Sequence, residues 1–137
     1  MEPNEPANGG AALRLFASEV RDFAHAHESP FGDRLVEALE RLEAVSGWLL
    51  EQAKSDPNSV GAASVEYLHV FGYTAYAYMW ALMARAALGK EGQDEFYASK
   101  LGTARFYFAR ILPRIHSLSA SVKAGSESLY LLDAAQF

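Results

Sequence analysis

The stretch VFGYTAYAYMWALMA, residues 70–84, contains no charged residue. Its apolar side chains point to nearly every side of a helix instead of forming one stripe, which is typical of a helix surrounded by other helices. Gly72, Ala75 and Ala77 are small enough to let a neighbouring helix approach closely. We therefore expect this stretch to be the central and most buried helix of the domain. The large residues expected inside include Tyr76, Met79 and Leu82.

The same stretch is too short to cross a membrane as a helix. It offers fifteen uncharged residues, whereas a spanning helix needs about 20. Glu66 and His69 precede it, and Arg85 follows it directly. Its tyrosines lie within the run and not at the two ends, where an aromatic belt would lie. The sequence therefore favours a buried helix of a bundle, and predicts no membrane partner.

Helical patterns continue on both sides of this stretch, with apolar residues spaced three and four apart. The expected helices cover residues 11–27, 33–54, 57–88 and 93–123. Asp56 and Pro57 predict an N-cap followed by proline in the first turn of the third helix. Gly89 predicts the end of that helix. Because no stretch alternates as a strand would, the fold class is all-α. We expect an antiparallel four-helix bundle with up-down topology and short connections.

The last expected helix, residues 93–123, has the most regular pattern. Its apolar seam alternates spacings of four and three through Tyr97, Leu101, Ala104, Phe108, Ile111, Ile115, Leu118 and Val122. Such a seam predicts the face that packs into the bundle. Pro113 lies within it, lacks an N–H group and clashes with the preceding turn. We expect a kink at Pro113 and a seam that continues unshifted beyond it.

A second, polar stripe follows the same helix. It consists of Thr103, Tyr107, Arg110, Arg114, Ser117 and Ser121. The simpler interpretation is an exposed face whose arginines pair with acids of the second helix, and we favour it. The alternative is a docking surface for an acidic partner or a phosphorylated ligand, because arginine forks suit carboxylates and phosphates. The candidate docking stripe is Thr103, Tyr107, Arg110 and Arg114.

Composition excludes several classes of protein. The chain has 137 residues, no cysteine and a net charge of −5, so a disulfide scaffold and a nucleic-acid binder are both disfavoured. The first ten residues hold prolines, asparagines and glycines, and we expect residues 1–10 to be a disordered leader or linker. They lack the features of a signal peptide, which predicts a cytoplasmic protein. Residues 11–137 are expected to form one bundle domain.

Two carboxylate–histidine pairs have the spacing of metal sites in helical bundles, Asp22 with His25 and Glu66 with His69. A di-iron site needs two such pairs and a carboxylate from each remaining helix, and the seam of the last helix has none. His25 and His27 point about 200° apart on a helix and cannot chelate one metal together. Because no nucleophile motif or phosphate-binding loop is present either, we predict no catalytic, cofactor-binding or metal-binding residue.

Several short motifs resemble a known family in their order and spacing. They are Leu68-x-x-Phe71-Gly72, Trp80-x-x-Met83-Ala84, the run from Phe96 to Tyr107, Arg110-x-Leu112-Pro113, and the C-terminal stretch from Gly125-x-x-x-Leu129 through Phe137. Together they resemble the additional C-terminal helical domain of long acyl-CoA dehydrogenases, of the methylthiopropanoyl-CoA dehydrogenase-like branch. The resemblance is clear over residues 64–137 and weaker over residues 11–60.

Enzymes of that family use FAD and a glutamate base to oxidise acyl-CoA thioesters between Cα and Cβ. Their flavin-binding domains and that glutamate precede the domain matched here, so no catalytic residue is carried over. The resemblance implies an accessory domain without catalysis of its own, which packs on an upstream flavin-binding core or on another subunit of a homo-oligomer. The alternatives are a stand-alone interaction or dimerisation module without a flavin partner, and a small enzyme or metal protein.

Overall fold

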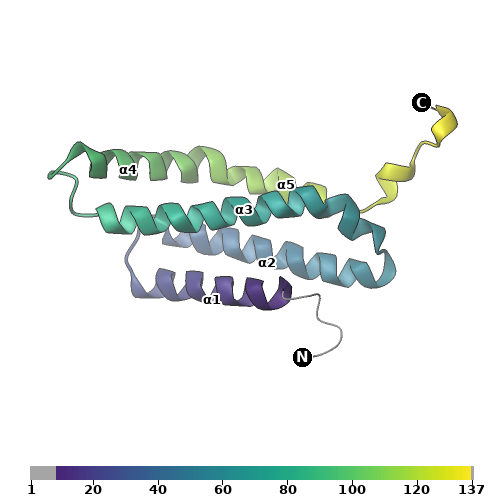
Figure 1. Ribbon diagram of the computed structural model, residues 1–137, viewed down its shortest axis with the longest axis horizontal. Coiled ribbons are helices and arrows are strands. Elements are labelled where there is room, and N and C mark those ends of the chain that lie inside the picture. The colour runs from purple at the N-terminus through teal and green to yellow at the C-terminus, as the bar shows by residue number, and fades with distance from the viewer. Residues whose placement is uncertain (1–8, 137) are drawn as a thin grey trace.

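A computed structural model describes residues 9–136, and within them the chain is all-α, as predicted (Figure 1). Residues 1–8 of the expected leader lie outside the described range, and the first helix begins at Gly9. The helices are α1 (Gly9–Ala26), α2 (Gly32–Ser55), α3 (Asn58–Ala87), α4 (Glu95–Phe106) and α5 (Ile115–Val122). A π turn (η1, Tyr107–Ile111) and a 3-10 turn (η2, Leu112–Arg114) join α4 to α5, and two further 3-10 turns follow α5 (η3, Glu127–Tyr130; η4, Ala134–Gln136).

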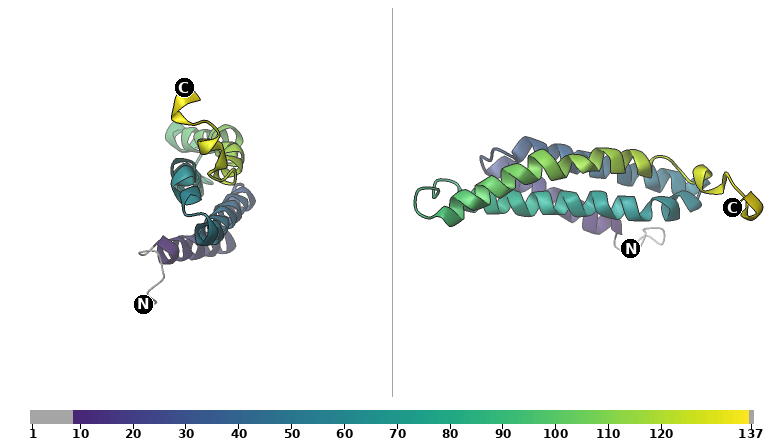
Figure 2. Two further views of the ribbon diagram at one scale, coloured as in Figure 1. Left: turned by 90° about the vertical axis from the view of Figure 1, so that its right-hand side faces the viewer. Right: turned by 90° about the horizontal axis from the view of Figure 1, so that it is seen from above.

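The helices lie side by side in the order in which they occur along the chain (Figures 1 and 2). α3 contacts α2 on one side and both α4 and α5 on the other, so it is the shared element of the core. α1 covers the edge of α2, and the Arg21 guanidinium on α1 pairs with the Glu43 carboxylate on α2. Aromatic side chains extend this contact to α3, where the Phe16 ring stacks on the Phe71 ring at 5.5 Å.

The inner side of α3 is built from small residues. Ala77, Ala81 and Ala84 are fully or almost fully buried, as is Thr74, whose Oγ1 donates to the Val70 carbonyl at 2.8 Å. Without long side chains between them, the neighbouring helix backbones can approach α3 closely. The burial of Ala77 agrees with a neighbouring helix close to it. At Gly72 an added methyl group would meet no atom within 4 Å, so the expected close approach does not occur there. The hydroxyl of Thr74 is buried with its hydrogen bond made.

The expectation that α3 is buried on all sides is wrong. The Tyr76 side chain is 64% exposed and Met79 is 49% exposed, while Leu82 is half-buried. Neighbouring helices cover only part of the circumference of α3, and the small residues occupy that covered part. Large apolar residues lie on both sides of α3: Val70 and Tyr78 are buried among the neighbouring helices, whereas Tyr76 and Met79 lie on the exposed side. Composition alone did not reveal which of them face solvent.

The α2–α3 connection also differs from the prediction. The Asp56 side chain makes no cap hydrogen bond to α3; its Oδ2 accepts a hydrogen bond from the Ser126 hydroxyl at 2.6 Å. The carboxylate that the sequence predicted as an N-cap thus binds the C-terminal segment instead. The expected stop at Gly89 is confirmed, because its φ of +83° is a left-handed conformation that favours glycine.

The seam of the last helix is confirmed at most positions, with one local shift. Leu101, Ala104, Phe108, Ile115 and Val122 are buried, whereas Ile111 is half-buried and Leu112 is buried in its place. The π turn has more residues per turn than an α-helix and moves the inward position forward by one residue. The tighter 3-10 turn at Pro113 then restores the original phase. The seam is therefore not unshifted, but it recovers at Ile115.

The packing of α3 makes a direct prediction for stability. Replacing buried Ala81 with leucine should lower the free energy of unfolding by about 1–3 kcal/mol, because it adds volume where helices already touch. Ala86 is exposed on the same helix, and its replacement with leucine should change stability by no more than about 0.5 kcal/mol. Urea unfolding followed by circular dichroism measures both. Equal losses would show that α3 is not close-packed at Ala81.

Candidate docking surfaces

The predicted docking stripe does not form one exposed surface. Thr103, Arg110 and Arg114 are exposed, but Tyr107 is buried. The Thr103 hydroxyl donates to the Ser99 carbonyl of its own helix at 2.9 Å. Arg110 lies in the π turn and Arg114 in the 3-10 turn, so a spacing of four residues does not place them as it would on a regular α-helix.

Tyr107 is part of the core between α3 and the last helix. Its hydroxyl donates to the backbone carbonyl of Tyr73, and its ring lies 6.5 Å from the Trp80 ring and 5.9 Å from the Phe108 ring. Burial raises the pKa of Tyr107 well above its ordinary value, because the charged phenolate would lose its hydration. This tyrosine therefore joins helices within the domain and is not available to a partner.

The pairing expected for the two arginines does not occur within the described part of the chain. Neither Arg110 nor Arg114 makes an ion pair with an acid of α2 there. Their guanidinium groups are exposed and leave the stripe as a polar surface of three residues, Thr103, Arg110 and Arg114.

A different and larger surface lies on the outer face of α3. Its large residues are Val65, Leu68, Tyr76 and Met79, which are 61%, 68%, 64% and 49% exposed. Together with Gly72 they follow spacings of three and four, which places them on one side of the helix. We call these four residues the α3 face. Exposed apolar patches that are contiguous in this way mark surfaces that bind other proteins or ligands.

Aromatic side chains border the α3 face on the side of α4. The Lys100 ammonium lies over the Trp80 ring at 5.9 Å and over the Phe96 ring at 5.2 Å, and Phe96 is exposed. A cation held over two rings keeps its charge at the edge of an apolar surface. This border therefore combines flat apolar area with one positive charge.

The C-terminal segment carries the second group of exposed apolar residues. Leu129, Tyr130, Leu131 and Leu132 are consecutive, and each is between 49% and 69% exposed. In Figure 1 the segment runs outward beyond the end of the bundle instead of along a helix. We call Leu129–Leu132 the tail.

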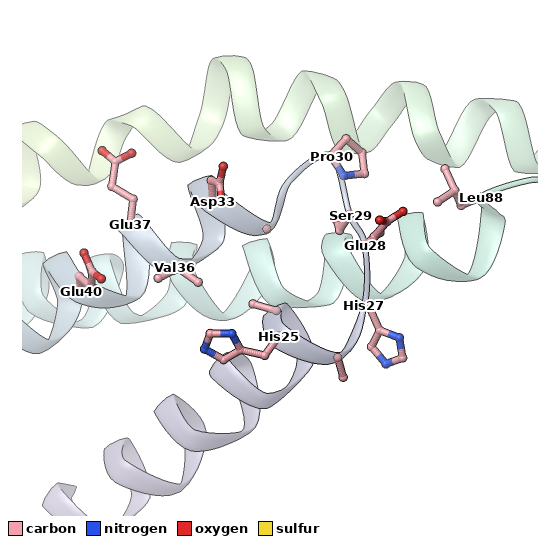
Figure 3. Close-up of a pocket in the computed structure, with 13 residues that line it drawn as sticks. His25, His27, Glu28, Ser29, Pro30, Asp33, Val36, Glu37, Glu40 and Leu88 are labelled. Atoms are coloured by element: carbon pink, nitrogen blue, oxygen red, sulfur yellow. The ribbon is translucent and has the colours of Figure 1, made fainter.

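A hollow lies where α1 ends and α2 begins (Figure 3). It has a volume of about 950 Å³, and its charged and ionisable lining residues are His25, His27, Glu28, Asp33, Glu37 and Glu40. Figure 3 shows that the two imidazole rings and the carboxylates do not converge on one point. Accordingly, the described residues include no group of three or more potential ligands that could hold a metal ion.

The carboxylate–histidine pairs recognised in the sequence thus gain no further ligand. His25 lines the hollow, and the His69 ring lies 6.4 Å from the Tyr73 ring. The described helices also include none that is long and apolar enough to cross a membrane. The exposed apolar residues of the α3 face and the tail remain as candidate docking surfaces.

Comparison of the sequence with known proteins identifies the family of the chain. Residues 16–133 match the family described as acetyl-CoA dehydrogenase C-terminal like. Because the match covers most of the sequence, the chain belongs to this family, and the resemblance found in the sequence is confirmed.

One particular relative is a 3-methylmercaptopropionyl-CoA dehydrogenase of Ruegeria pomeroyi. The chain is 29% identical to it over 131 residues, which cover 89% of the chain. Those residues correspond to only 22% of the length of that enzyme.

Sequence reasoning missed both the α3 face and the tail. On α3 the signal was hidden, because residues 70–84 contain no charged residue that would show which side faces solvent. In the tail, four large apolar residues in succession between Glu127 and Asp133 were visible in the sequence, but only the structure shows that no helix covers them.

Substitution of Tyr107 tests its placement in the core. At neutral pH, Tyr107→Phe should cost about 0.5–1.5 kcal/mol through loss of one hydrogen bond. The pKa of Tyr107 is raised in the folded state. Its contribution to the free energy of unfolding is therefore complete below the pKa of tyrosine in the unfolded chain, about 10, and is lost as the pH rises above that value. The wild-type free energy of unfolding should therefore fall more steeply between about pH 10 and 11 than that of the variant. Parallel curves would place Tyr107 in solvent.

Proposed function

We propose that this chain is a non-catalytic accessory domain of an acyl-CoA dehydrogenase-like flavoenzyme. In this proposal the α3 face packs on the catalytic core or on another subunit. The single observation that carries it is the exposure of Val65, Leu68, Tyr76 and Met79 on a helix whose other side is the core of the domain. Membership in the C-terminal family supports the same assignment.

The parent reaction in this proposal is the FAD-dependent oxidation of an acyl-CoA thioester between Cα and Cβ. The residues described here do not fit FAD. The lining of the hollow between α1 and α2 includes Glu28, Asp33, Glu37 and Glu40, and four carboxylates would repel the diphosphate of the cofactor. We therefore assign the flavin and the catalytic base to other parts of the enzyme, and no catalytic role to this chain.

The proposal also includes the arrangement of the domain. We take α1 to α5, which begin at Gly9 and end at Val122, as an antiparallel bundle of up-down topology with the last helix bent near Pro113. The short connections and the π and 3-10 turns at residues 107–114 support it. The protein would work in the cytoplasm, and the polar stripe of Thr103, Arg110 and Arg114 would be a second contact with an acidic partner surface.

A binding measurement tests this function. The chain should bind a separately expressed flavin-containing core of the same enzyme, and the double variant Tyr76→Lys/Met79→Lys should weaken binding at least tenfold, because two charges would be buried without partners. The matched control is Leu15→Lys/Leu50→Lys, which changes two exposed leucines on α1 and α2.

Isothermal titration calorimetry would give both affinities, with circular dichroism to verify folding. Core binding that is unchanged by the α3 variant, or weakened equally by the control, would contradict packing of the α3 face on the catalytic core.

A further inference from the structure

The tail begins at a fixed point on the domain. The Ser126 hydroxyl is buried and donates to the Asp56 carboxylate at 2.6 Å, which ties the chain to the α2–α3 connection. Gly125, immediately before it, has a φ of +76°, a conformation that other residues adopt with strain. The direction in which the tail leaves the bundle is therefore built into the fold and does not result from fraying of the last helix.

The chemistry of the tail is that of a short docking segment. Leu129–Leu132 contains no charged residue, and all four side chains are exposed. Acidic residues flank it on both sides, Glu127 and Asp133. Four successive large apolar side chains in water are unfavourable unless another surface covers them.

The α3 face has the complementary properties. It is uncovered and apolar, and the positive charge of Lys100 lies at its border over Trp80 and Phe96. An acid flanking the tail could approach this ammonium while the tail covers the apolar residues, so charge as well as hydrophobicity is matched. The chain thus carries both an uncovered apolar segment and an uncovered apolar surface.

The geometry favours a face on another molecule. The tail leaves the bundle at the end where α2 meets α3 and runs away from the helices (Figures 1 and 2). To reach the α3 face of its own domain, it would have to reverse direction directly after the anchor at Ser126. A second copy can instead approach with its α3 face toward the outgoing tail.

We propose that two copies of this chain exchange tails, so that Leu129–Leu132 of each copy packs on Val65, Leu68, Tyr76 and Met79 of the other. The exchange is reciprocal and forms a closed two-fold pair, in which each copy contributes the same two surfaces. This inference rests on the proposed function and specifies its partner. The α3 face packs on another subunit, and it does so through the tail of that subunit.

Light scattering on the purified 137-residue chain tests the exchange. The wild type should have an apparent mass near twice 15.0 kDa. The tail variant Leu129→Lys/Leu131→Lys and the face variant Tyr76→Lys/Met79→Lys should each fall to about half of the wild-type mass. All four residues are exposed in the single chain, so folding should be preserved, as circular dichroism would verify. The control Leu15→Lys/Leu50→Lys should keep the wild-type mass.

Mixing the two variants distinguishes exchange from other modes of pairing. The tail variant retains an intact face, and the face variant retains an intact tail. Neither variant should pair with itself. In the mixture, the intact tail of the face variant can pack on the intact face of the tail variant, so mixed pairs should form. An affinity tag on one variant would capture them. Pairing in the mixture and in neither variant alone would support the exchange.

Other outcomes would overturn it. If the face variant is monomeric while the tail variant remains paired, the faces pack on each other and the tail is not the ligand. If the wild type is monomeric but the face variant loses binding to the flavin-containing core, the exchange is wrong and the proposed function stands. If the face variant alters neither association nor core binding, both proposals fail.

Discussion

The close packing of α3 against its neighbours through small side chains is the constraint on which the rest of this structure depends. Ala77, Ala81 and Ala84 give α2, α4 and α5 a surface without protruding groups, and the neighbouring backbones can come near. The polar side chain within this layer, Thr74, binds its own helix through the Val70 carbonyl. Replacing such small residues with large ones would force the helices apart, since a packed interior has little free volume.

The same constraint determines what the domain presents to its surroundings. With the alanines of α3 facing inward, the uncovered side of the helix carries large apolar residues such as Tyr76 and Met79, although Tyr78 is buried. An apolar outer face of this kind is typical of a surface that binds a partner. The chain belongs to a family described as C-terminal like, and the proposed function gives this face a catalytic core or a further subunit as its partner.

Local patterns were readable from the sequence, and features that depend on distant contacts were not. The helix boundaries and the stop at Gly89 follow from periodicity and from glycine chemistry, and the structure confirms them within a few residues. The role of Asp56 was misassigned because its partner, Ser126, lies 70 residues away. Tyr107 was placed on the docking stripe, but it lies three residues after buried Ala104, and its hydroxyl reaches the Tyr73 carbonyl on α3. The exposed side of α3 was hidden because no charge marks it.

The most direct test of this account is the solvent accessibility of Tyr76 and Met79 in the assembled enzyme. Hydroxyl-radical footprinting with mass spectrometry would compare the 137-residue chain under dissociating dilution with the same chain in the complete assembly. The account predicts that oxidation of both side chains falls severalfold on assembly, while oxidation of Leu15 on α1 does not change. Equal oxidation of Tyr76 and Met79 in the two states would show that the outer face of α3 remains in water, and would contradict the central claim.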